Sequence, residues 1–148
     1  MAEIVVIGGS GFIGRHLVRR LVEGGAKVRV VSRSAGTIPD LPAVEYVTAA
    51  VGNTAEMLKA LEGSREVYHL AAGGGANWAD FERDFVAGAH NVAEACRQHG
   101  VRRLVYASSI AVLYLGDGGI ITEVAGVDPK PAARSAYARA KIAAEGVL

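Results

Sequence analysis

The stretch that decides the fold is Ile4-Val5-Val6-Ile7-Gly8-Gly9-Ser10-Gly11-Phe12-Ile13-Gly14, in which four apolar residues run directly into a glycine cluster. The residues that follow continue as an amphipathic pattern. Its apolar positions are Phe12, Ile13, Leu17, Val18, Leu21 and Val22. This order predicts a buried strand, a tight turn and then a helix.

The glycines in this stretch have the spacing of a phosphate-binding turn, either as Gly9-x-Gly11-x-x-Gly14 or as Gly8-x-x-Gly11-x-x-Gly14. The first glycine permits a turn closed to residues with a Cβ, Gly11 lets the backbone approach a pyrophosphate, and Gly14 lets the helix pack close to the strand. The N–H groups that open the helix would bind the phosphates. The alternative is a glycine-rich turn without a ligand. The residues predicted to bind a dinucleotide here are Gly8, Gly9, Ser10, Gly11, Phe12, Ile13 and Gly14.

Composition limits the class of protein. The 148 residues suit one globular domain, 51% of them are hydrophobic, and the net charge of +1 gives no electrostatic case for nucleic acid or an anionic membrane as partner. The single cysteine, Cys96, excludes an intrachain disulfide, suits a reducing compartment and lies in a helical pattern typical of packing. No apolar run reaches membrane-spanning length, and no signal peptide precedes the first strand. We therefore predict a cytoplasmic protein, and we predict no metal site.

Strands and helices alternate along the chain. After the first strand, strands are expected at 27–31, 44–47, 66–70 and 103–107. Helices are expected at 11–23, 54–61, about 79–99, and from about 133, with the last one still running at Leu148. The long helix keeps an apolar stripe of Phe81, Phe85, Gly88 or Ala89, Val92 and Cys96. This alternation predicts an α/β, Rossmann-type parallel sheet of order 3-2-1-4-5 with helices on both faces, all in one domain over residues 1–148.

The end of the second strand bears on the choice of cofactor. An acidic residue there would bind the ribose hydroxyls of NAD, but this chain has Ser32 and Arg33. A guanidinium can hold a 2′-phosphate, so the position favours NADP over NAD, and Arg15 could add positive charge nearby. A solvated loop arginine is the alternative for Arg33. His69 lies inside an apolar strand and is interpreted as a core residue.

A second group of polar residues follows the fifth strand. Ser108 and Ser109 close that strand, and Tyr137 and Lys141 share one face of the last predicted helix because they are four residues apart. An ammonium beside a phenol favours the phenolate, and such a tyrosine can exchange a proton with a substrate hydroxyl. A serine hydroxyl can hydrogen-bond the same substrate oxygen.

With these motifs in this order, the chain resembles the extended short-chain dehydrogenase/reductase family. That group includes NAD-dependent epimerase/dehydratases and enzymes similar to 3β-hydroxysteroid dehydrogenase and dihydroflavonol reductase. The segments that carry the resemblance are 8–14, 67–72, 106–112 and 137–141. The resemblance implies an NAD(P)-dependent interconversion of alcohol and carbonyl on a nucleotide sugar or a ketone. It also implies a homodimer through the long helix and the Tyr-Lys helix.

The resemblance also assigns residues. It implies Ser109, Tyr137 and Lys141 as the catalytic set, with Tyr137 and Lys141 also at the cofactor, where Lys141 would hold the nicotinamide ribose. It implies that Ala71, Ala72 and Gly73 line the cofactor. Three positions depart from the family: Ala49-Ala50-Val51 replaces Gly-Asp-Leu, Phe85 replaces an asparagine of the proton relay, and Val112-Leu113-Tyr114-Leu115-Gly116 is altered by one residue.

Length is the largest departure. Relatives of this type continue for a long stretch past the Tyr-Lys helix, and that stretch supplies the last strands and most of the substrate pocket. We therefore expect the carboxyl-terminal substrate-binding part to be absent from this chain, with a sheet edge and the last helix exposed. The alternatives to an enzyme are a non-catalytic NAD(P)-binding module and a truncated remnant.

Overall fold

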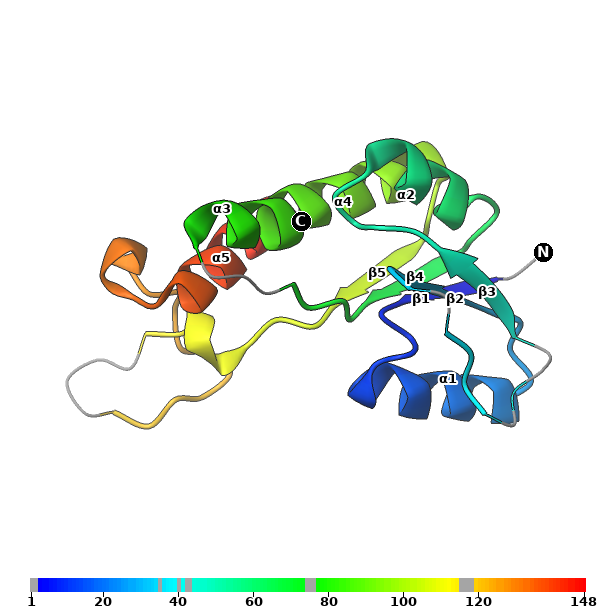
Figure 1. The fold of residues 1–148 in the computed structure, drawn as a ribbon. Coiled ribbons are helices and arrows are strands. Elements are labelled where there is room, and N and C mark those ends of the chain that lie inside the picture. The colour runs from blue at the N-terminus through cyan, green and yellow to red at the C-terminus, as the bar shows by residue number, and fades with distance from the viewer. Residues whose placement is uncertain (1–2, 35, 40, 42–43, 74–76, 115–118) are drawn as a thin grey trace. The chain divides into compact units, whose positions relative to one another are not determined.

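The computed structural model describes residues 3–34, 36–39, 41, 44–73, 77–114 and 119–148 (Figure 1). It divides into two compact units. The sheet unit consists of Met1–Ala72 and Asn91–Ala107, and the α5 unit consists of Gly73–His90 and Ser108–Leu148.

The sheet unit contains five parallel strands in the order β3-β2-β1-β4-β5, which confirms the predicted order. Their bounds are β1 (Ile4–Ile7), β2 (Val28–Ser32), β3 (Glu45–Thr48), β4 (Glu66–His69) and β5 (Arg103–Tyr106). Ile7 pairs with Val31 on one side and with His69 on the other, so the carboxyl ends of three strands lie level beside the glycine turn. The strands β2 and β3 each begin one residue later than predicted.

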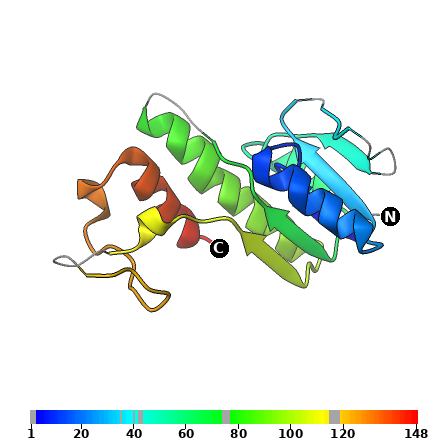
Figure 2. The same ribbon diagram turned by 90° about the horizontal axis from the view of Figure 1, so that it is seen from below.

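Helices cover both faces of this sheet, as predicted. Figures 1 and 2 show α1 (Phe12–Glu23) on one face and α2 (Thr54–Leu61) on the other, beside the part of α4 (Gly88–Gln98) that belongs to the sheet unit. Val18 of α1 packs in a cluster with Val6 and Val30. Each fully buried aliphatic side chain of this kind stabilises the fold by about 1.5–3 kcal/mol.

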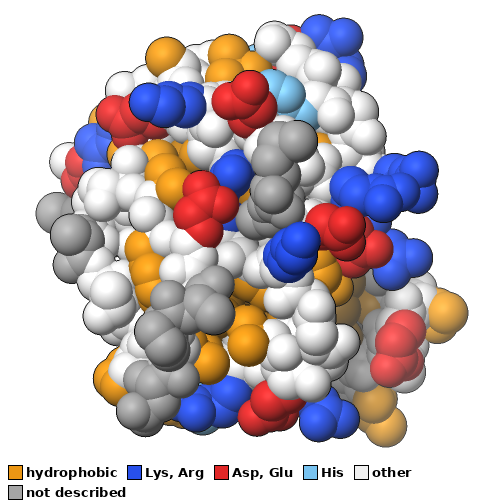
Figure 3. Space-filling view, turned by 90° about the vertical axis from the view of Figure 1, so that its right-hand side faces the viewer, with side chains coloured by type: hydrophobic (Ala, Val, Ile, Leu, Met, Phe, Trp, Pro, Cys, Tyr) orange, Lys and Arg blue, Asp and Glu red, His pale blue; other side chains and the backbone are white. Residues whose placement is uncertain are grey.

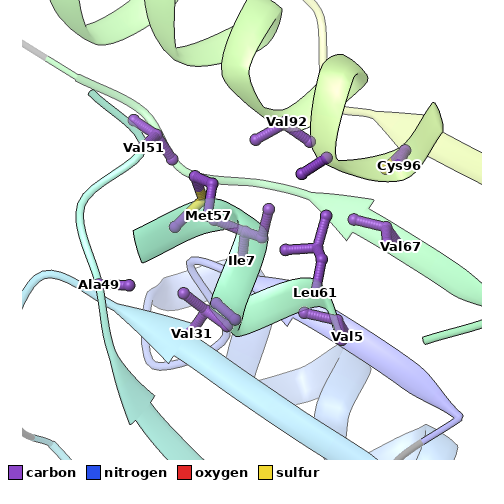
Figure 4. Packing of buried hydrophobic residues seen from close by; sticks show 12 residues of the cluster. Val5, Ile7, Val31, Ala49, Val51, Met57, Leu61, Val67, Val92 and Cys96 are labelled. Atoms are coloured by element: carbon purple, nitrogen blue, oxygen red, sulfur yellow. The ribbon is translucent and has the colours of Figure 1, made fainter. Parts of the chain in front are cut away.

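The core on the second face joins the sheet to α2 and α4. Figure 4 shows Met57 and Leu61 of α2 and Val92 of α4 directed toward Ile7 of β1. Asn91 ties the two helices together, because its side chain donates to Val51 O at 2.9 Å and accepts from the Thr54 hydroxyl at 3.0 Å. Val92 and Cys96 of the predicted amphipathic stripe therefore lie in this core, whereas Phe81 and Phe85 belong to the α5 unit.

The α5 unit is mainly helical. Its elements are α3 (Trp78–Phe81), the π-helical segment η1 (Glu82–Ala87), the 3₁₀ segments η2 (Ile110–Val112) and η3 (Pro131–Ala133), and α5 (Ala136–Glu145). The helix α5 packs against the other four, and Figure 2 shows it lying beside the α3 end of the long helix.

Two predicted helices differ from the observed ones. The helix expected at 79–99 is three consecutive segments, α3, η1 and α4, because a π-helical insertion interrupts the α-helical hydrogen bonding. The last helix does not reach Leu148 but ends at Glu145, where Gly146 follows. It begins at Ala136 because Pro131 opens a separate 3₁₀ turn.

Two residues interpreted as packing residues are buried. His69 is 1% exposed and its ring lies 5.2 Å from that of Tyr106. Burial raises the pKa of the Cys96 thiol to about 11, so this thiol is protonated and a poor nucleophile near neutral pH.

Charged and apolar side chains are mixed on the face of the molecule drawn in Figure 3. Figure 3 shows acidic and basic side chains interspersed on one side of the molecule, in keeping with the net charge of +1. Among the described residues, no helix has the length and hydropathy needed to span a membrane.

Candidate functional site

The glycine turn between β1 and α1 has no room for side chains at two positions. Gly8 has φ +81°, and a Cβ there would lie 2.8 Å from Ala71 N at the end of β4. A Cβ on Gly14 would lie 2.2 Å from Gly8 O and 2.6 Å from the Gly9 Cα. The turn and the helix are therefore in direct backbone contact, as the glycine spacing predicts.

The amino terminus of α1 is open for an anion. Gly11 is its N-cap residue, and among the described residues no side chain caps it by a hydrogen bond. By contrast, Asn53 caps α2 by accepting from Glu56 N at 3.2 Å. The first turn of α1 carries no acidic residue, and Phe12 and Ile13 are 76% and 65% exposed. The structure thus fits a pyrophosphate at this terminus, because N–H groups and a positive dipole end lie free of side chains.

The other predicted cofactor residues of the sheet unit lie at the same edge of the sheet. Ser32 ends β2, and its hydroxyl donates to Ser34 O at 2.8 Å, while Arg33 is exposed. Ala71 and Ala72 follow β4 closely, and Leu70 N donates to Ile7 O at 2.9 Å. The carboxyl ends of parallel strands are where ligands bind in open α/β sheets.

Tyr137 and Lys141 lie one turn apart on α5. Ser135 caps the helix, because its hydroxyl accepts from Ala138 N at 3.2 Å, so the first turn is fixed by its own sequence. Tyr137 is 38% exposed and Lys141 is 3% exposed. One side chain of the pair is thus accessible, and the other is enclosed.

A single aromatic ring contacts both members of this pair. The Phe85 ring of η1 lies 5.8 Å from the Tyr137 ring in an edge-to-face arrangement, and the Lys141 Nζ lies 5.0 Å from the Phe85 centroid. Burial lowers the pKa of Lys141, and the charge of Glu145 one turn later acts in the opposite direction. The sequence predicted that Tyr137 and Lys141 share a helix face, but not that one ring contacts both.

Ser109 lies in the same unit. It caps η2, where its hydroxyl accepts from Ala111 N at 3.2 Å, and it lines an open pocket of about 520 Å³. Glu145 of α5 lines the same pocket, so the Ser109 turn and the Tyr-Lys helix border one space. The remaining lining residues are Ser108, Ile110, Val112, Leu113, Ile121, Thr122 and Glu123.

A charged clamp that the sequence analysis missed joins the Ser109 turn to the segment before α5. The Asp128 carboxylate is ion-paired with Arg134 and accepts from Lys130 N at 2.8 Å, and Arg134 also donates to Ala111 O at 3.4 Å. Asp128 N donates to Val112 O at 3.0 Å. Asp128 and Arg134 lie six residues apart outside any periodic pattern, so only their opposite charges within a short segment could have drawn attention to them.

The predicted site residues divide between the two units. The glycine turn, Ser32, Arg33, Ala71 and Ala72 belong to the sheet unit, whereas Gly73, Ser109, Tyr137 and Lys141 belong to the α5 unit. Gly73 packs tightly on η1, since a Cβ there would lie 2.1 Å from the Asp84 Cβ. Of the altered family segment, Leu115 and Gly116 lie outside the described residues.

Comparison with known proteins identifies one family whose model matches nearly the whole chain. A model of the NAD dependent epimerase/dehydratase family matches residues 4–148. The chain is 36% identical over 116 residues to a decarboxylating sterol-4-alpha-carboxylate 3-dehydrogenase of Mus musculus, covering 77% of this chain and 32% of that protein. It is 35% identical over 114 residues to a 2-alkyl-3-oxoalkanoate reductase of Stenotrophomonas maltophilia, covering 76% and 34%.

Solved structures show the same likeness. MoeE5 in complex with UDP-glucose and NAD matches with a TM-score of 0.82 and 31% identity, over 98% of this chain and 47% of that one. The chain thus spans about a third of the length of these curated relatives and about half of this solved structure.

Proposed function

The chain belongs to the NAD-dependent epimerase/dehydratase family, and on that premise we propose that it is the cofactor-binding part of an oxidoreductase that interconverts an alcohol and a carbonyl. The observation that carries the proposal is the pairing of Tyr137 with an enclosed Lys141 on one face of α5, both in contact with the Phe85 ring. A module that only binds a nucleotide has no physical need for such a pair.

The proposed cofactor residues act through the backbone as much as through side chains. The N–H groups at the start of α1 would bind the pyrophosphate, and Gly8 and Gly14 keep the turn free of side chains. Ala71, Ala72 and Gly73 would line the dinucleotide, and Lys141 would hold the nicotinamide ribose. The nicotinamide, when bound, supplies or accepts the hydride.

The proton chemistry belongs to the chain itself. The Tyr137 hydroxyl would give a proton to the carbonyl oxygen during reduction and take it back from the alcohol during oxidation. The Ser109 hydroxyl would donate a hydrogen bond to the same oxygen, and the Lys141 ammonium would stabilise the phenolate that Tyr137 becomes.

The substrate class follows from the relatives only in outline. The names of two relatives indicate a sterol acid and an alkyl oxoalkanoate as their substrates, and MoeE5 binds UDP-glucose. We therefore propose a ketone, a secondary alcohol or a nucleotide sugar as the substrate of the protein to which these residues belong.

Replacing Tyr137 tests the catalytic assignment. Tyr137→Phe removes the hydroxyl and keeps the ring, so turnover with NADH or NADPH and a panel of ketones should fall by about a thousandfold or more, while cofactor affinity stays nearly unchanged. Tyr114→Phe, an exposed tyrosine of the same unit, is the matched control. Equal turnover in Tyr137→Phe would remove Tyr137 from the mechanism and favour a non-catalytic binding module.

Titration of the purified chain with NADPH and with NADH tests the choice of cofactor. We propose a preference for NADP, supported by Arg33 directly after β2, and Arg33→Asp should reverse it. Arg19→Asp, an exposed arginine on α1, controls for the change in net charge. Tighter binding of NADH by the unaltered chain would contradict the preference and keep the cofactor site.

Assembly and location stay predictions. We propose a homodimer through α4 and α5, and sedimentation at increasing protein concentration tests it. The cytoplasmic location rests on the single cysteine.

A further inference from the structure

The Phe85 side chain is the most enclosed large group beside the Tyr-Lys pair. It is 2% exposed and stacks on the Phe81 ring, with centroids 5.8 Å apart and an interplanar angle of 16°. Its segment η1 is π-helical, and a π-helical insertion redirects side chains relative to a regular helix. Phe85 thus packs on Phe81 of its own helix and at the same time contacts α5.

The two contacts of Phe85 with α5 both depend on the charge distribution of its aromatic ring. The face of an aromatic ring is negative and its edge is positive. Lys141 Nζ lies 5.0 Å from the ring centroid, within the range of a cation–π contact, and Tyr137 meets the ring in an edge-to-face arrangement. An ammonium that has lost most of its water gains more from a ring face than an exposed one.

We propose that Phe85 is a positioning residue that holds the charged Lys141 ammonium and the Tyr137 ring in one arrangement through its π face. This inference rests on the proposed function, because the arrangement has a purpose only if Tyr137 transfers a proton. The ring is uncharged, so its contact with the ammonium adds no second charge beside the phenol.

Other titratable groups on the packed elements bear on the test. On α5, Tyr137 precedes Lys141 by one turn and Glu145 follows it by one turn, and the Arg139 guanidinium lies over the Trp78 ring. On the segments against α5, η1 carries Glu82, Arg83 and Asp84, and α3 carries Asp80; η2 and η3 carry none. All of these groups remain unchanged in the variants below, so any difference between variants comes from the ring.

NMR of the unaltered chain, without cofactor or substrate, gives the first test. The chain has four lysines, and Lys27, Lys59 and Lys130 are exposed, so they serve as references in the same spectrum. Lys141→Arg identifies the Lys141 signal. A ring face above the ammonium should move the Lys141 Hε signals upfield of the other three. Lys141 signals that coincide with the references would overturn the proposal.

Variants then separate the ring from simple burial. Phe85→Leu keeps an apolar side chain and removes the π face, so the pKa of Lys141 should fall by about half a unit to one unit. Phe85→Tyr should restore it. Phe81→Leu removes the neighbouring ring and should leave the value nearly unchanged. An unchanged or raised value in Phe85→Leu would mean that Phe85 only fills space, and the proposal would be wrong.

These readouts use neither turnover nor cofactor binding. Loss of the proposed function in the Tyr137→Phe experiment therefore leaves the Lys141 measurement intact. The opposite outcome is a Lys141 signal that coincides with the reference lysines in a chain whose turnover still requires Tyr137. That outcome would refute only the role of Phe85 and would leave the proposed function in place.

Discussion

The helices α1 and α5 carry the two halves of the proposed chemistry, and they begin in opposite ways. The first turn of α1 follows a glycine and is free of capping side chains among the described residues. The first turn of α5 is closed by the Ser135 hydroxyl on Ala138 N. A helix that leaves its N–H groups open can bind an anion with its backbone, whereas a closed one must act through its side chains.

The two helices also differ in how closely side chains surround them. Glycines keep side chains out of the β1–α1 turn, so the backbone itself is the binding surface. On α5 the surroundings are filled, with Lys141 enclosed and the Phe85 ring against it. We therefore expect added atoms to disrupt the β1–α1 turn. We expect the removal of atoms to disrupt the surroundings of Lys141 on α5.

The largest effect should come from adding one carbon at Gly14. In Gly14→Ala the Cβ would lie 2.2 Å from Gly8 O, and neither backbone can move without separating α1 from β1. We expect a loss of about 3 kcal/mol in the free energy of unfolding, despite the better helix propensity of alanine, and no measurable binding of NADH or NADPH. Urea unfolding and calorimetric titration measure the two effects.

Gly126→Ala is the control for that substitution. Apart from Gly126 itself and its two neighbours in sequence, no atom of the described residues lies within 4 Å of the place where its Cβ would be. Its unfolding free energy should stay within about 0.5 kcal/mol of the unaltered chain. If the two variants were equally stable, the close contact between α1 and the turn would be refuted.

A capping side chain at the start of α1 should weaken cofactor binding without lowering the stability of the fold. Gly11 has an extended backbone, φ −73° and ψ 178°, so Gly11→Asp can cap α1 as Asn53 caps α2. The variant should keep or slightly raise the melting temperature and bind NADH and NADPH about tenfold more weakly or worse, because the carboxylate occupies the N–H groups and repels the pyrophosphate. Gly11→Ala controls for the added Cβ, and unchanged affinity in Gly11→Asp would place the phosphates elsewhere.

The features that the sequence predicts are those that depend on residues close together along the chain. The strand, turn and α1 were predicted because the apolar run and the glycine spacing act over a few residues, and the sheet order followed from the alternation of strands with helices. The π-helical insertion at η1 was not predicted, because an apolar stripe does not reveal one extra residue in a turn. The contact of Phe85 with Lys141 joins residues 56 positions apart in sequence and needs the folded structure.

Removing the caps of the two closed helices should give smaller, matched losses. Asn53→Ala and Ser135→Ala each delete one hydrogen bond to a backbone N–H, worth about 1 kcal/mol. Asn53→Ala should cost more of the two, because the Asn53 amide also donates to Glu56 Oε1 at 2.8 Å. Amide hydrogen exchange in the first turns of α2 and α5 measures each loss locally. No change in either helix would contradict the capping assignments.

The smallest effect should appear only in acid, at the clamp that precedes α5. The Lys130 N–H and then Arg134 lower the pKa of Asp128 in the folded chain. The folded chain therefore favours the carboxylate, so this contribution to stability is complete above the unfolded pKa of aspartate, near 4, and is lost as the pH falls through the lower folded-state value. Asp128→Asn should flatten the fall of the urea midpoint below about pH 4, and Glu123→Gln in the same segment should leave the slope unchanged. Because Arg134 also reaches Ala111 O, an acid slope that Asp128→Asn does not alter would show that the Ser109 turn is held without this charge.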